Sequence, residues 1–194
     1  MKKIFQILSI PLTIIFIGIL IYGLVIGNSK SSNYNKELMN KYKTKEVRLA
    51  YFENNKESFI YIAKLFDKYE DIEKLINKKK NESCNEKEIT LTNDLALCVP
   101  SSFKEELDKE TILNHINNLK DINVIRKEMV INTSNKEVEK SVSFYITEST
   151  NTNVSFNYCL NNVECNTSEE YTEKENKISE KNKIDEEWNT IYKE

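Results

Sequence analysis

The stretch that decides the fold is 141-SVSFYITESTNTNVSFNYCL-160, in which two runs of apolar residues alternate with mostly polar ones. The alternating apolar residues are Val142, Phe144, Ile146, Val154, Phe156, Tyr158 and Leu160. Strict alternation is typical of strands with one buried face, and the connector "TNTN" favours a tight turn. The stretch therefore predicts two antiparallel strands, at 139–148 and 153–160.

Working outward, a third strand is predicted at 122–132, joined to the next by the turn-forming "SNKE". The three strands together predict an antiparallel three-stranded meander with one apolar face. Helices are expected to pack on that face, so the fold class is α+β.

Helical spacing precedes the strands. From Lys45 to Lys80 the apolar residues recur three or four positions apart, which predicts an amphipathic helix. "EITLTNDLALCVP", which ends at Pro100, predicts a short hairpin or one bent strand. A second helical region is expected from Ser102, which stands in capping-box spacing with Glu105, and Asp108 is the point where it would break.

The N-terminus carries an apolar segment. Residues 4–26 contain no charge and follow Lys2 and Lys3. As a helix the run would reach about 34 Å, enough for a hydrocarbon core of about 30 Å, and it is longer than the roughly 7 to 15 residues of a signal core. We therefore expect a single-pass membrane protein with a cytoplasmic N-terminus and an extracytoplasmic body. The alternative is cleavage after Gly27 and secretion.

This predicts five segments along the chain. Residues 1–27 form an uncleaved transmembrane signal-anchor, 28–44 a polar tether and 45–165 an extracytoplasmic α+β domain. Residues 166–183 have few apolar side chains and are expected to be a mobile charged linker. Residues 184–194 regain apolar residues and are expected to dock on the domain.

Composition excludes several function classes. All three glycines lie at or before Gly27, so the body lacks the glycines that phosphate-binding loops and nucleophile elbows need. Residues 28–194 hold all 31 acidic residues and all but Lys2 and Lys3 of the 28 basic ones, a net charge of −5. That charge argues against a nucleic-acid partner.

The four cysteines predict disulfides. An even number in an exported domain suggests two bonds, and the sequence-local pairing is Cys84 with Cys98 and Cys159 with Cys165. A zinc site is disfavoured because no two cysteines are two to four residues apart. No metal, cofactor or catalytic site is predicted.

Two classes of function remain. The leading one is a non-enzymatic interaction module at the cell envelope, held to the membrane by residues 4–26 and binding an unknown envelope or membrane protein. The other is an extracytoplasmic hydrolase-type enzyme that uses scattered carboxylates or the single histidine, His115. Adjacent acids such as Glu105–Glu106 and Glu186–Glu187 are too common in this chain to decide between the two classes.

Overall fold

The structure, a computed structural model, describes residues 33–77, 82–131, 138–148, 152–160, 170–174 and 177–193. The chain divides into two compact units, Met1–Asn40 and Lys41–Glu194. Residues 33–40 of the first unit are helical. The predicted membrane segment 4–26 lies outside the described residues. No helix among the residues described is long and apolar enough to cross a membrane.

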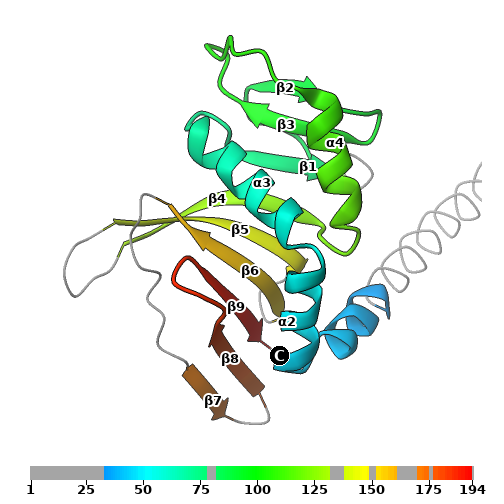
Figure 1. The fold of residues 1–194 in the computed structure, drawn as a ribbon, viewed down its shortest axis with the longest axis vertical. Helices are drawn as coiled ribbons and strands as arrows, with labels where there is room; N and C mark the ends of the chain where they lie inside the picture. The colour runs from blue at the N-terminus through cyan, green and yellow to red at the C-terminus, as the bar shows by residue number, and fades with distance from the viewer. Residues whose placement is uncertain are drawn as a thin grey trace, which may run out of the picture. The chain divides into compact units, whose positions relative to one another are not determined.

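The second unit is built on one antiparallel sheet of nine strands, and the expected three-stranded meander is wrong. The strand order is β2-β3-β1-β4-β5-β6-β9-β8-β7 (Figure 1). The strands are β1 (Lys74–Asn77), β2 (Lys87–Thr90), β3 (Leu95–Val99), β4 (Val124–Ile131), β5 (Val138–Glu148), β6 (Asn153–Cys159), β7 (Glu170–Lys174), β8 (Lys177–Lys183) and β9 (Trp188–Lys193). The three predicted strands are β4, β5 and β6, which form the middle of this larger sheet. The segment 88–100 forms the β2–β3 hairpin.

Helices α2 (Lys45–Asn54) and α3 (Lys56–Lys68) cross one face of the sheet (Figure 1). An aromatic cluster joins them to it. Phe59 lies 5.1 Å from Phe144 and 5.0 Å from Phe156, and Phe52 lies 4.9 Å from Trp188, measured between ring centroids. All five side chains are at most 1% exposed. The alternation in β5 and β6 thus selects the face that packs on the helices.

The single helix expected over Lys45–Lys80 is wrong in its length. It is interrupted at Asn55, whose side-chain amide donates to the Tyr51 carbonyl, and α3 ends at Lys68. The apolar residues Leu75 and Ile76 beyond that point belong to β1, the strand that lies between β3 and β4, and both are buried. Three- and four-residue spacing over so short a run fits a buried strand as well as a helix.

The second helix also begins later than the sequence suggested. Helix α4 runs from Lys109 to Asn118, and its N-cap is Asp108, whose Oδ1 accepts from the Thr111 amide at 3.1 Å. The expected start at Ser102 is wrong. Residues 103–108 are not helical, and Phe103 is instead buried at 4% exposure.

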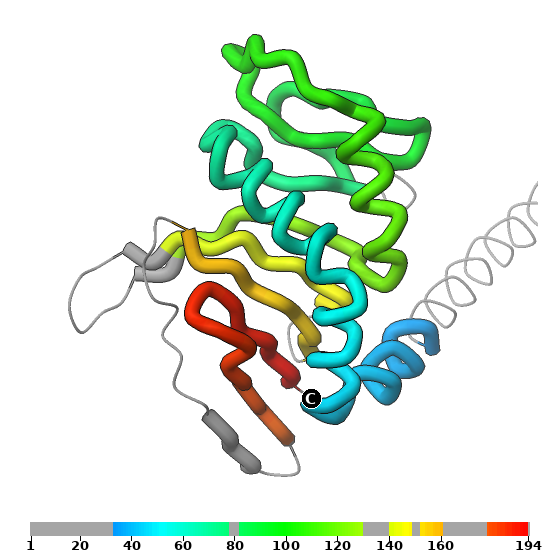
Figure 2. Tube along the Cα trace, viewed as in Figure 1, coloured from blue at the N-terminus to red at the C-terminus, as the bar shows by residue number. Residues whose placement is uncertain are grey.

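The region expected to be a mobile linker, 166–183, contains β7 and β8. These polar strands are held by backbone pairing, β7 with β8 and β8 with β9. The last strand, β9, returns to pair with β6 and so lies between β6 and β8. Figure 2 shows this return, with the red trace of β9 beside the orange trace of β6. The segment expected to dock, 184–194, therefore contains an interior strand of the sheet, β9.

A buried arginine fastens α2 to β8. Arg48 is 0% exposed, and its Nη1 donates to the carbonyls of Tyr42 and Lys43 at 3.0 and 2.8 Å. Its Nη2 donates to Glu180 at 2.7 Å and to Asn182 at 2.8 Å. The planar fork of arginine can reach all four acceptors at once, which a lysine ammonium cannot.

Candidate functional site

The sheet forks between β1 and β4. The two strands pair at only two positions, Lys74 with Arg126 and Leu75 with Ile125, whereas β4 pairs with β5 over its whole length. Beyond Arg126 the chain that precedes β1 turns away toward α3, so the second half of β4 extends past its neighbour. A pocket of about 490 Å³ opens at this fork.

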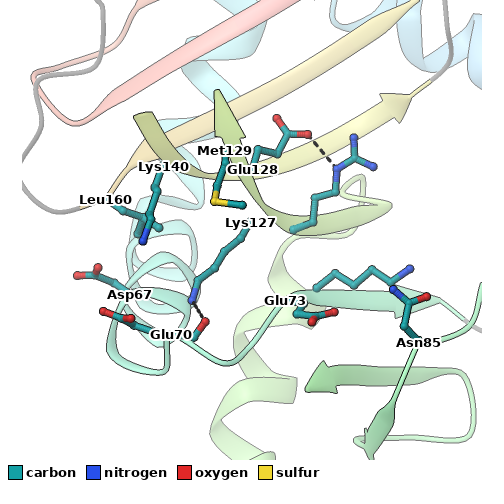
Figure 3. Close-up of a pocket in the computed structure, with 11 residues that line it drawn as sticks. Asp67, Glu70, Glu73, Asn85, Lys127, Glu128, Met129, Lys140 and Leu160 are labelled. Carbon is teal, nitrogen blue, oxygen red and sulfur yellow. Dashed lines mark hydrogen bonds and ion pairs between the residues drawn. The ribbon is translucent and has the colours of Figure 1, made fainter. Parts of the chain in front are cut away.

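The pocket is lined from both sides of the sheet (Figure 3). On the α3 side lie Asp67 of the helix, Glu70 and Glu73 of the α3–β1 connection, and Lys127 of β4. Met129, Lys140 and Leu160 extend this wall along the sheet. Lys74, Asn85, Arg126 and Glu128 complete the lining, and alternation along β4 places Arg126 and Glu128 on the opposite side from Lys127.

Lys127 closes the end of α3 at the pocket wall. Its ammonium donates to the carbonyls of Tyr69 at 3.0 Å and Glu70 at 2.7 Å, which are the C-cap of the helix and the residue after it. Burial lowers the pKa of Lys127, although the carboxylates of Glu70 and Asp67 oppose this shift. A cation at a helix C-terminus also complements the negative end of the helix dipole.

On the opposite side of β4 a polar network is already complete. Arg126 donates to Glu128 at 2.9 Å and to Glu148 at 2.5 Å, and its guanidinium lies 4.8 Å from the centre of the Tyr145 ring. Glu128 also accepts from Ser143 at 3.0 Å and from the Tyr145 hydroxyl.

The network shifts two ionisation equilibria. Burial and the hydrogen bond to Glu128 raise the pKa of Tyr145 to about 12. Burial alone would lower the pKa of Arg126, but its bond to Glu128 and the neighbouring negative charges outweigh this and raise it. The guanidinium is therefore charged, and its bonds to Glu128 and Glu148 hold it.

The carboxylates on the α3 side are not bound in such a network in the described part of the chain. Among the described residues, no hydrogen bond or ion pair engages the side-chain oxygens of Asp67, Glu70 or Glu73. Met129 is 72% exposed and Leu160 is 5% exposed, so a small apolar surface borders these charges. The pocket can therefore offer charged groups of both signs and an apolar contact to a polar ligand.

In the part of the chain that the structure describes, neither a metal site nor a serine, cysteine or histidine centre for catalysis is assembled at the pocket. No group of three or more His, Cys, Asp or Glu side chains is placed to hold a metal ion there. The pocket lining includes no serine, cysteine or histidine.

His115 lies elsewhere, between α3 and α4. Its Nδ1 is 3.1 Å from the Ser58 hydroxyl, and its ring stacks on Tyr61 with centroids 4.1 Å apart. Asn118 donates to the same hydroxyl at 3.1 Å. Ser58 is only 3% exposed, so these contacts join two helices and leave the hydroxyl out of reach of a substrate.

The adjacent acidic pairs are also apart from the pocket. Glu105 and Glu106 precede α4, and Glu186 and Glu187 lie between β8 and β9. All four side chains are exposed. The structure does not bring these carboxylates together with His115.

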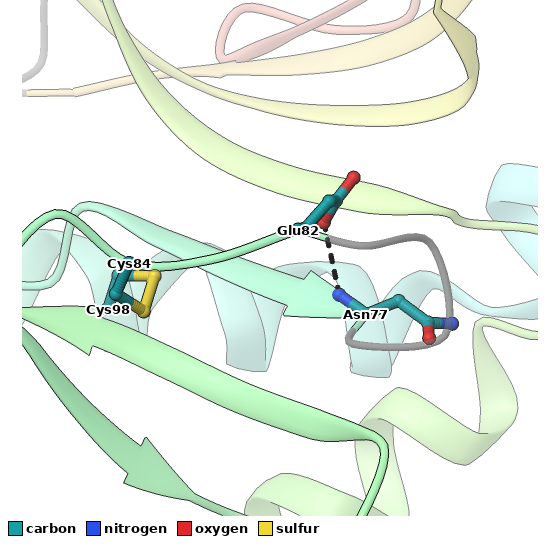
Figure 4. The surroundings of a disulfide bond; sticks show 4 residues. All are labelled: Asn77, Glu82, Cys84 and Cys98. Atoms are coloured by element: carbon teal, nitrogen blue, oxygen red, sulfur yellow. Dashed lines mark hydrogen bonds between the residues drawn. A yellow bond between two sulfur atoms is a disulfide. The ribbon is translucent and has the colours of Figure 1, made fainter. Parts of the chain in front are cut away.

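The cysteines form disulfides. Cys84 and Cys98 are bonded, with Cα atoms 5.2 Å apart, which is the pairing that the sequence suggested (Figure 4). The bond joins the segment before β2 to β3 and packs on Ile76 and Ala96. Cys159 is also disulfide-bonded, and its expected partner Cys165 lies outside the described residues.

Sequence reasoning missed the pocket because its residues follow no motif. One signal was available: Arg48 and Arg126 are the only arginines among 28 basic residues, and each binds several acceptors.

No protein-family model, curated protein or solved structure matches the chain.

Proposed function

We propose that this protein is a non-enzymatic binding module that acts outside the cytoplasm, at the cell envelope, and recognises its ligand at the fork between β1 and β4. The observation that carries the proposal is the pocket itself. Within the described residues the carboxylates of its α3 side have no partner and Met129 is exposed, so they are available to a ligand, whereas two of its cations, Arg126 and Lys127, are held by hydrogen bonds. Preorganised charges of this kind favour binding because little side-chain entropy is lost.

The extracytoplasmic location is supported by the Cys84–Cys98 bond, because structural disulfides persist in oxidising compartments and are rare in the cytosol. Residues 4–26 would deliver the body across the membrane and hold it there, with secretion after cleavage as the alternative.

Binding is tested on the full chain in detergent micelles with a panel of charged probes: free amino acids, short peptides, amino sugars and inorganic phosphate. We expect one class of probe to raise the unfolding temperature and the pocket variant Asp67→Asn to weaken that response. The matched control Glu106→Gln, an exposed acid outside this pocket, should respond like the wild type. Equal responses from both variants would place the ligand elsewhere, and no response to any class would remove the support for the binding role.

The location is tested separately on intact cells with a membrane-impermeant thiol reagent. Cys84 and Cys98 should react only after an impermeant reductant has been added. Labelling that requires permeabilised cells would place the body inside the cytoplasm and contradict the proposal.

A further inference from the structure

The second half of β4 exposes backbone hydrogen-bonding groups inside the sheet. The Lys127 amide points to the side of β4 on which β1 lies, and it donates at 2.9 Å to the carbonyl of Glu73, the residue before β1. Successive residues of a strand direct their backbone groups alternately to its two sides, so the N–H and C=O of Met129 point the same way. At Met129 β1 has already turned away, and in the described part of the chain no strand lies on that side.

An independent contact gives the same direction. Met129 is paired with Lys140 of β5, and the Lys140 carbonyl accepts from the Leu160 amide at 2.9 Å on the far side of β5. The pair Met129–Lys140 is therefore one of the non-hydrogen-bonded pairs of the ladder. The backbone groups of Met129 thus face the pocket and not β5.

In the described part of the chain, no proline and no covering segment protects this edge. Exposed strand edges are normally blunted by charged side chains, proline or a covering segment. Here the outermost residue whose side chain is described is Met129, at 72% exposure. An apolar side chain beside free backbone groups suits a strand that accepts another strand.

The walls of the pocket limit what can be added. Asp67 and Glu70 stand on one side of the fork and Asn85 on the other, so a segment added to the edge would lie between them.

The charges differ between the two sides. On the α3 side three carboxylates, those of Asp67, Glu70 and Glu73, face the two lysines Lys127 and Lys140. On the opposite side Arg126 is already paired with Glu128 and Glu148, whereas Lys74 makes no ion pair among the described residues and is the cation that this wall can offer. Neighbouring residues of an added strand point to opposite sides. A segment with a basic residue next to an acidic one therefore complements both walls.

We propose that the open edge of β4 binds an extended peptide segment of another protein by strand addition, and that it prefers adjacent residues of opposite charge. This inference rests on the proposed function, since it names the partner class for the same pocket. Main-chain hydrogen bonds to Met129 supply affinity, and the two charged walls supply selectivity.

The test uses a fluorescent blocked peptide, Thr-Val-Lys-Glu-Val-Thr, titrated into the full chain in detergent micelles and followed by anisotropy. A peptide of the same composition, Thr-Lys-Val-Glu-Val-Thr, places Lys and Glu on one side of the strand and should bind roughly tenfold more weakly. A probe with methylated backbone amides should lose binding, because it cannot donate to the edge.

Two variants separate the backbone from the side chain. Met129→Pro removes the edge amide without removing a bond to β5, and it should weaken binding about tenfold, the value of one good hydrogen bond. Met129→Ala keeps the amide and should stay within about threefold of the wild type. The fluorescence of the buried Trp188 checks that both variants are folded.

Equal affinity of folded Met129→Pro and wild type would overturn the proposal. If Met129→Pro does not fold, hydrogen exchange in the wild type decides: the probe should slow exchange of the Met129 amide, and unchanged exchange would overturn strand addition. Dimerisation of the chain that Met129→Pro abolishes would identify a second copy as the occupant and also overturn it. A response of the pocket to the other charged probes, without peptide binding, would leave the binding role standing and reject only the peptide.

Discussion

Replacing Arg48 by methionine should remove the connection between α2 and β8 with little change in side-chain volume. The substitution leaves the carbonyls of Tyr42 and Lys43 and the side chains of Glu180 and Asn182 without the guanidinium that now satisfies them. Removing one partner of a buried ion pair costs about 3 to 5 kcal/mol. Because the Glu180 side chain is 21% exposed and can be rehydrated, we expect the lower end, about 3 kcal/mol.

Urea denaturation of the full chain in micelles, followed by Trp188 fluorescence, measures this loss. The control Arg48→Lys keeps the charge but cannot reach both carbonyls and β8, so its loss should be smaller but clear, about 1 to 2 kcal/mol. Hydrogen exchange should accelerate most in β8. A loss below about 1 kcal/mol for Arg48→Met, or exchange unchanged in β8, would refute the view that this arginine holds the strand.

Other regions of the fold give three further predictions. Phe144→Ala and Phe156→Ala should each lower the free energy of unfolding by about 3 to 5 kcal/mol, because both rings are fully buried; small, equal shifts of the urea midpoint would contradict this. The raised pKa of Tyr145 means that its contribution is complete below pH about 10 and is lost as the pH rises toward 12, so the wild type should lose more stability over that range than Tyr145→Phe, and parallel curves would refute it. Reducing the Cys84–Cys98 bond, whose sequence separation is 14, should lower the free energy of unfolding by about 3 kcal/mol. The measurement compares the stability lost on adding a reductant in the wild type with that lost in the double variant Cys84→Ser/Cys98→Ser; equal losses would show that the bond is not structural.

Local patterns predicted the strands that carry alternating apolar residues on the face toward the helices, β5 and β6. Val142 and Phe144 lie on the face that packs on the helices because alternation matches the pleat, and the same rule identified β6; a register shift between Tyr145 and Thr147 ends the alternation before Ile146 can follow it. Polar strands gave no such signal. Strand β8 is held by its pairing with β9 and by the bonds of Arg48 to Glu180 and Asn182, contacts that span 132 and 134 residues of sequence.

The pocket could not be predicted from the sequence for a related reason. It exists because β1 is four residues long and β4 is eight, so β4 extends beyond the point where its pairing with β1 ends. Strand length depends on where the α3–β1 connection turns, and that turn depends in part on Lys127 binding the carbonyls of Tyr69 and Glu70. None of these residues belongs to a motif of fixed spacing. The sequence shows these charged residues, but it does not show that they lie together around one pocket.

The position of β9 sets an order for assembly. Because β9 is made after β8 yet lies between β8 and β6, the sheet cannot grow strand by strand as the chain emerges. Until Trp188 arrives, the aromatic cluster lacks one of its members and β6 has an unpaired side. A chain interrupted before that residue would present a long apolar edge to its neighbours, so quality control should recognise such fragments as unfinished and degrade them.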